Sequence, residues 1–157
     1  MFAIGDKIVY PMHGAGIIEK IEEKKILGET RRYYVLKVPC GDMKIMIPVD
    51  NSQDIGIRSI VSDEQLILVM QTLQDKSSEM SANWNRRYRE NMEKLKTGDV
   101  IEVAEVVRNL MRTDREKKLS TGEKKMLSNA RQILLSEIIL IKGIDMNEAS
   151  NIIDRAV

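Results

Sequence analysis

Ser62-Asp63-Glu64-Gln65-Leu66 marks the point at which the pattern of this chain changes from strands to helices. A serine followed three residues later by glutamine, directly before an apolar run, has the form of a capping box at a helix N-terminus. Apolar residues then recur at helical spacing, at Leu66, Val69, Met70 and Leu73. This stretch therefore divides the chain, and each side of it has its own periodicity.

Upstream of this stretch, short runs rich in β-branched and aromatic residues predict β-strands. The predicted strands cover residues 7–10, 17–25, 32–38 and 43–49. Glycine or proline punctuates the segments between them, at Pro11 to Gly16, Gly28-Glu29 and Pro39-Cys40-Gly41-Asp42. Short strands joined by short turns predict a small, strongly bent barrel or sheet.

Downstream of this stretch, helical spacing continues to the end of the chain. Helices are predicted over 62–73, over 84–96, from Val100 through Met111, and from a second capping box at 120–123 up to Gly143. Asp145 is expected to cap a last helix that ends near Ala156. The sequence therefore predicts an α+β protein, with a β domain over 1–60 and an all-helical domain over 61–157.

The composition is that of a folded, water-soluble protein with little net charge. The 157 residues are 43% hydrophobic and 31% charged, and the net charge of +1 argues against a general polyanion binder. Basic residues gather locally instead, with five bases against two acids in 84–96 and seven against three in 108–125. Such patches suit nucleic-acid binding, although surface helices often carry similar charge.

The sequence offers no catalytic or metal-binding motif, so neither an enzyme nor a cofactor is predicted. His13 is the single histidine, which excludes a histidine-pair metal site, and we expect it in a turn. Cys40 is alone and is expected to be a simple turn or surface thiol. Neither GxxxxGK[ST] nor GxSxG occurs. The N-terminus lacks a secretory signal and the apolar run 138–141 is too short for a membrane span, so a cytoplasmic location is expected.

The strongest chemical signal is Asn83-Trp84-Asn85-Arg86-Arg87-Tyr88-Arg89, which holds the only tryptophan of the chain. A wide aromatic ring beside several guanidinium groups can grip phosphates and press against an opened base step. Helical spacing, however, places Trp84 on one stripe with Tyr88, Met92 and Leu95, which favours a core position. Against this, Trp84 lies in the first turn, where a side chain can overhang the packed face.

The arginines of the same helix also have two interpretations. Arg86 and Arg89 share a different side of the helix from Trp84, and each precedes a glutamate by four residues. Pairs at this spacing support a helix internally, so Glu90 and Glu93 can take up part of the charge. The residue pattern alone leaves both DNA contact and a plain solvated face open.

Several segments, in order along the chain, match a known family. They are Gly5 to Gly16, Tyr34 to Val38, Pro48 to Asn51, Asn83 to Tyr88, Gly98 to Val100, Ala104 to Arg108, Leu119 to Leu127 and Ala130 to Leu134. On these segments the sequence resembles the CarD/CdnL family of bacterial transcription regulators over nearly its whole length. The first segment also resembles a domain of transcription-repair coupling helicases, but this chain has no helicase motifs.

For the N-terminal part, the resemblance implies a Tudor-like RNA polymerase interaction domain. Such a domain is expected to dock on the lobe of the polymerase β subunit by pairing an exposed strand edge with a strand of the partner. The expected polymerase contacts are Lys24, Ile26, Tyr33, Lys44 and Met46. Relatives often carry a basic residue where this chain has Met46, and Lys44, on the same strand face by alternation, could substitute.

For the helical part, the resemblance implies binding to promoter DNA at the upstream edge of the transcription bubble. Trp84 is expected to wedge into the minor groove at the fork and oppose reclosing of the bubble. Basic residues are expected to hold the phosphates without reading sequence; they are Arg86, Arg87, Arg89, Lys124 and Lys125. The expected outcome is a longer-lived open promoter complex. The protein is expected in the cytoplasm, associated with the nucleoid through RNA polymerase.

Two alternatives remain from other classes of protein. One is a general nucleic-acid module that does not bind polymerase. The other is an adaptor on RNA polymerase that makes no direct DNA contact and buries Trp84 in its core. We expect a monomer, with pairing of an exposed strand edge between copies as the alternative.

Overall fold

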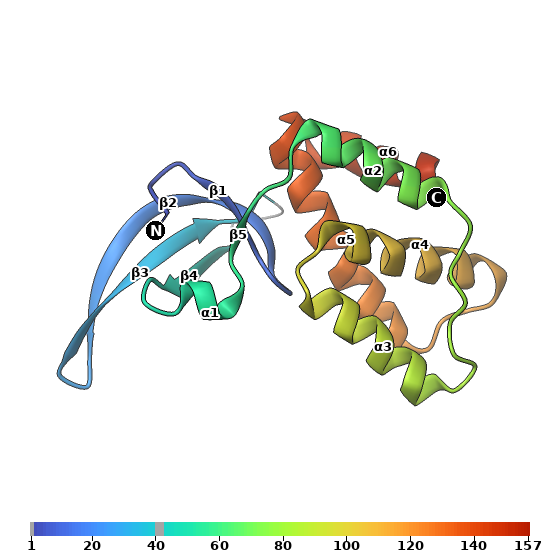
Figure 1. Cartoon of the computed structure of the whole chain (residues 1–157), viewed down its shortest axis with the longest axis horizontal. Helices are drawn as coiled ribbons and strands as arrows, with labels where there is room; N and C mark the ends of the chain where they lie inside the picture. The colour runs from blue at the N-terminus through green and yellow to red at the C-terminus, as the bar shows by residue number, and fades with distance from the viewer. Residues whose placement is uncertain (1, 40–42) are drawn as a thin grey trace.

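The chain folds into an antiparallel sheet followed by a group of helices, as the computed structural model shows (Figure 1). The structure describes residues 2–39 and 43–157, so the predicted turn at Cys40 lies outside it. Within these residues the strand order is β4-β3-β2-β1-β5. The strands are β1 Lys7–Tyr10, β2 Gly14–Ile26, β3 Glu29–Lys37, β4 Lys44–Pro48 and β5 Arg58–Ser59. The predicted α+β class is confirmed.

The hairpin of β2 and β3 is longer than the sequence pattern predicts. Both strands extend three residues further toward their N-termini than expected, and the tip of the hairpin lies far from the helices (Figure 1). The outer pairs, such as Lys24 with Arg31, keep the backbone ladder although their side chains are charged and exposed. Leu27 and Gly28 turn the chain with φ values of 51° and 81°, as in a two-residue hairpin loop.

Two short elements were not predicted, because neither is long enough to show a period. Helix α1 spans Ser52–Ile55, and β5 adds two residues to the edge of the sheet by pairing with β1. The predicted division at residue 60 falls between β5 and the first long helix.

The predicted long helices are confirmed. They are α2 Asp63–Gln74, α3 Trp84–Lys96, α4 Val100–Glu116, α5 Thr121–Lys142 and α6 Met146–Ala156. Helices α2 and α6 begin at the caps expected for them, Ser62 and Asp145. The Ser62 capping box forms in full, and Asn83, Asp99 and Asp145 cap α3, α4 and α6 through their side-chain oxygens. Gly143 ends α5 in the left-handed conformation at φ 64°.

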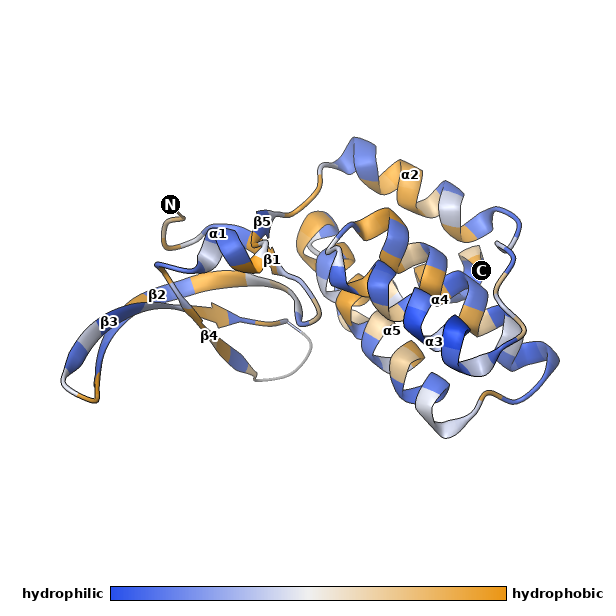
Figure 2. Ribbon diagram, turned by 60° about the horizontal axis from the view of Figure 1, so that its bottom comes forward, coloured by the Kyte–Doolittle hydropathy of each residue, from blue (hydrophilic) through white to orange (hydrophobic). Residues whose placement is uncertain are grey.

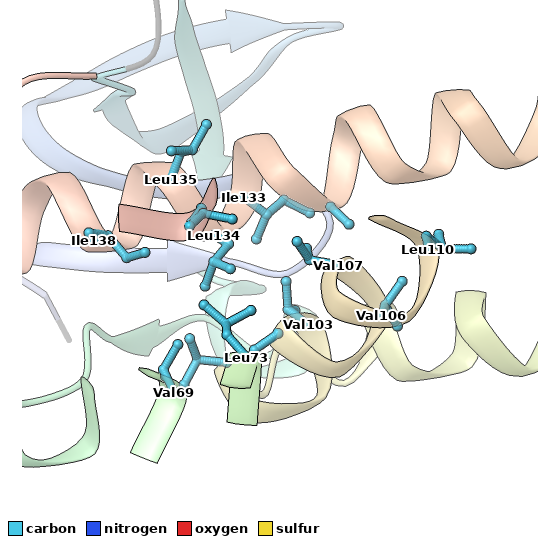
Figure 3. Packing of buried hydrophobic residues seen from close by; sticks show 14 of the residues in the cluster. Val69, Leu73, Val103, Val106, Val107, Leu110, Ile133, Leu134, Leu135 and Ile138 are labelled. Carbon is cyan, nitrogen blue, oxygen red and sulfur yellow. The ribbon is translucent and has the colours of Figure 1, made fainter. Parts of the chain in front are cut away.

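The main apolar core lies between α2, α4 and α5. Val69 and Leu73 of α2, Val107 of α4, and Leu134 and Ile138 of α5 are almost fully buried and converge on one another (Figure 3). A second, smaller core fills the concave side of the sheet, whereas the outer part of the β2–β3 hairpin is mainly hydrophilic (Figure 2). The hairpin arm is therefore held by backbone pairing more than by packing.

Hydrogen bonds as well as packing join the sheet to the helices. We call this region, which contains Ala15, Arg58, Ser136 and Glu137, the junction. The backbone N–H of Ala15 in β2 donates to Ser136 Oγ of α5 at 2.8 Å. Arg58 of β5 donates from Nη1 and Nη2 to both carboxylate oxygens of Glu137, at 2.9 Å each. The Val61 N–H donates to the same carboxylate at 2.9 Å. Glu137 is only 2% exposed, so these three bonds satisfy a charge that has little access to water.

Gly14 is the point of closest approach at this junction. Its φ of 104° lies in the region that L side chains avoid, and a Cβ built there would stand 2.7 Å from Ser136 Oγ. The backbone of β2 can therefore approach α5 closely enough for the Ala15 bond only because position 14 has no side chain.

Candidate nucleic-acid interface

Trp84 opens α3 and lies on the surface, 40% exposed. Its ring stacks on Tyr88, with ring centroids 5.1 Å apart and an interplanar angle of 20°. Its Nε1–H donates to Ser120 Oγ at 2.9 Å. The core position that helical spacing favours for Trp84 is therefore wrong, because the stripe is buried only further along α3, at Leu95. In the first turn the side chain overhangs the packed face and meets the N-terminus of α5.

Arg87 and Glu123 form a bidentate ion pair that ties α3 to α5. Arg87 Nε and Nη2 donate to the two oxygens of Glu123 at 2.9 and 3.0 Å, and Nη1 donates to the Ser81 carbonyl at 3.1 Å. The two side chains are 17% and 4% exposed. The guanidinium lowers the pKa of the Glu123 carboxyl, chiefly by hydrogen bonding, against the opposing effect of burial.

These bonds change the expected role of two residues. Three donors of Arg87 already have partners within the protein, so we assign Arg87 to holding α3 against α5, and its predicted phosphate contact stays a prediction. The capping box predicted at 120–123 forms only in part. Ser120 Oγ accepts the Glu123 N–H at 3.3 Å, but the Glu123 carboxylate is turned to Arg87 and to the Ser120 hydroxyl.

The other predicted DNA contacts are exposed basic residues around the same two helix N-termini. Arg86 pairs with Glu90 at 2.8 Å, as its spacing predicts, yet remains on the solvent side of α3. Arg89, Lys124 and Lys125 are exposed, and the described residues provide no ion-pair partner for them. The N-termini of α3 and α5, which meet where Trp84 bonds Ser120, add partial positive charge. This end of the helical bundle, which we call the Trp84 end, suits a polyanion.

The five residues expected at the polymerase share one face of the sheet. Strand register pairs Lys24 with Arg31, Tyr33 with Pro48 and Met46 with Val35, and side chains alternate between the faces. By this alternation the face opposite to the core carries all five, namely Lys24, Ile26, Tyr33, Lys44 and Met46. Ile26 is 49% exposed, and Lys44 pairs with Glu19 at 3.0 Å. We call this surface the outer sheet face.

The outer sheet face ends at an unpaired strand edge. β4 is the last strand on its side of the sheet, so within the described residues one side of its backbone has no neighbour. The outer residues of β3, from Glu29 to Arg31, continue this edge beyond the end of β4. An edge of this kind can accept a strand from another protein.

Sequence reasoning missed Ser120 and Glu123 as partners of Trp84 and Arg87. The helix-start pattern at 120–123 identified their local role, but each bond to α3 spans 36 residues of chain. Only the folded arrangement brings these side chains together.

Among the described residues, none of the helices has the length and apolar composition to cross a membrane. The same residues contain no cluster of three or more potential metal-ligating side chains.

Comparison with known proteins matches both parts of the chain. The family model for the CarD-like/TRCF RID domain matches residues 2–61, and the model for the CarD C-terminal domain matches residues 68–154. The chain is also 49% identical over 144 residues to the protein of Bacillus subtilis (strain 168) named "Putative transcription factor YdeB". That match covers 92% of this chain and 94% of the relative. The two models together span most of the sequence, and the chain belongs to the CarD family of transcription factors.

Proposed function

We propose that this protein binds the β subunit of RNA polymerase and stabilises the open promoter complex through Trp84 at the upstream edge of the bubble. The observation that carries the proposal is an exposed tryptophan, held by Tyr88 and Ser120, beside exposed basic residues. Stacking of a base on an aromatic ring is worth about 1–3 kcal/mol. A ring held at the fork opposes restacking of the upstream bases by an energy of this order.

The proposed DNA contact is independent of sequence. Arg86, Arg89, Lys124 and Lys125 contact phosphates, which fix the register of a protein on a duplex but carry no base information. The N-termini of α3 and α5 add to the same field, since backbone N–H groups there favour anions. Binding should therefore weaken steeply with salt.

The proposed polymerase contact uses the outer sheet face and the free edge of β4. An added strand gains backbone hydrogen bonds along the edge, while side chains on the adjoining face provide selectivity. Lys44 and Met46 lie on the edge strand itself, and Lys24 and Ile26 lie on the hairpin arm. The match to the CarD-like/TRCF RID domain supports polymerase as the partner.

The test is the lifetime of the open complex on a ribosomal-RNA-type promoter after competitor challenge, with cognate polymerase. We expect wild-type protein to lengthen the lifetime. With folded Trp84→Ala the lifetime should be about 5- to 150-fold shorter than with wild type, because the stacking energy is lost. Trp84→Phe, which keeps a ring, should retain part of the effect. If the wild-type protein leaves the lifetime unchanged, the proposal is wrong at the DNA step.

A second arm tests the partner. Lys44→Glu should weaken retention on immobilised polymerase. Lys142→Glu makes the same charge change at an exposed lysine on α5, outside the sheet, and should not weaken it. Retention by polymerase without any effect on the open complex would support the adaptor. DNA binding without retention would support a general nucleic-acid module.

A further inference from the structure

We propose that Ser120 is a positioning residue, whose hydroxyl holds the Trp84 ring in the orientation in which it meets DNA. This inference rests on the proposed function, because it concerns how the ring is presented. It goes beyond that function by assigning a role to a polar side chain on a different helix, 36 residues further along the chain.

The ring of Trp84 is held on three sides although much of it is exposed. Tyr88 covers one face, and Ser120 accepts the indole N–H. Gly122 lies against the edge of the ring, where a Cβ would stand 3.3 Å from Cζ2. Without the bond to Ser120, a side chain in the first turn of a helix could leave this position by rotation about χ1 and χ2. The hydroxyl thus supplies the only directional restraint among these three contacts.

Every hydrogen-bonding site of the Ser120 hydroxyl is in use. A serine hydroxyl has one donor and two acceptor lone pairs. It accepts from Trp84 Nε1 at 2.9 Å and from the Glu123 N–H at 3.3 Å, and it donates to Glu123 Oε1 at 3.3 Å. The hydroxyl therefore cannot turn away from the indole without breaking a bond to its own helix.

Glu123 is itself fixed by α3, which closes the chain of contacts. Arg87 grips both oxygens of this buried carboxylate, and Arg87 lies one turn along from Trp84 on the same helix. The contacts run from Trp84 to Ser120, from Ser120 to Glu123, and through Arg87 back to α3. The ring is consequently ordered before DNA arrives, and ordering such a side chain only on binding would lower affinity by about 3- to 10-fold.

The test compares Ser120→Ala with Ser62→Ala and Ser120→Thr. Ser62 is a matched control because its side chain caps α2 in the same way but does not bond Trp84. We expect both alanine variants to lose thermal stability, since each removes one N-cap, and Ser120→Ala also removes the bonds to Trp84 and the Glu123 carboxylate. Only Ser120→Ala should lower the time-resolved fluorescence anisotropy of the single tryptophan, and Ser120→Thr should restore it.

The same variants are then compared in the open-complex assay. Ser120→Ala should reduce the stabilising effect about 3- to 10-fold relative to Ser62→Ala, and Ser120→Thr should recover it. Equal anisotropy and equal lifetimes for the two alanine variants would overturn the positioning role. The anisotropy needs no polymerase, so failure of the proposed function is seen separately, as an open-complex lifetime that neither wild type nor Trp84→Ala changes.

Discussion

Glu137→Gln should destabilise the whole protein by about 3 kcal/mol, because it removes the buried charge at the junction. The carboxylate accepts three hydrogen bonds at 2.9 Å, two from Arg58 and one from the Val61 N–H. Removing one partner of a buried pair typically costs about 3–5 kcal/mol. We take the lower end because the Arg58 side chain is 28% exposed and water can solvate part of it. For a chain of this length the loss lowers Tm by roughly 6–12 °C.

The assay is a double-mutant cycle with Arg58→Met, measured by urea unfolding. The two single changes should not add, and the coupling energy between them should exceed about 1 kcal/mol. Arg86 and Glu90 provide the comparison, since they are ion-paired at 2.8 Å but are 72% and 50% exposed. Their coupling should be about 0.3–0.5 kcal/mol. Single changes at 58 and 137 that simply add would refute the reasoning that the junction depends on this pair.

Two more predictions concern stability. In urea unfolding, Gly14→Ala should lower the free energy of unfolding more than Gly143→Ala. Both positions have positive φ, but only at 14 would the new Cβ meet an atom, Ser136 Oγ, at 2.7 Å. Equal losses would contradict this. Glu123 has a lowered pKa in the folded protein, so its stabilising effect is present above the unfolded pKa of about 4.3 and is lost as pH falls through the lower folded value. The stability difference between wild type and Glu123→Gln should therefore shrink on acidification, and a difference that does not change with pH would count against it.

The parts of the fold that local chemistry determines could be predicted from the sequence. The caps at Ser62 and Asp145 are such cases, because a polar side chain and the next turn of helix are neighbours in the chain. The β2–β3 hairpin was predicted too short, because its outer pairs carry charged residues that show no apolar alternation. Backbone hydrogen bonds stabilise the outer part of this hairpin, and they do not depend on a particular pattern of side chains.

The environment of the candidate site could be predicted only in part. The identity of Trp84 as the outstanding residue was visible, but the helical stripe placed it in the core. In the fold, Trp84 lies in a first turn that overhangs the packed face, and its partner Ser120 comes from a distant segment of the chain. In the same way, the guanidinium of Arg87 could serve as a phosphate ligand, and only the fold reveals that it already donates hydrogen bonds to Glu123.

The close approach at Gly14 also limits how this sequence can be recombined with others. A β segment taken from another protein would need glycine at this position, and an arginine equivalent to Arg58, before it could seat against α5. An α5 taken from elsewhere would in turn need a small hydroxyl residue and a carboxylate in succession, as Ser136 and Glu137 are here. A chimera that exchanges one half without these residues inherits two intact folds that no longer fit together.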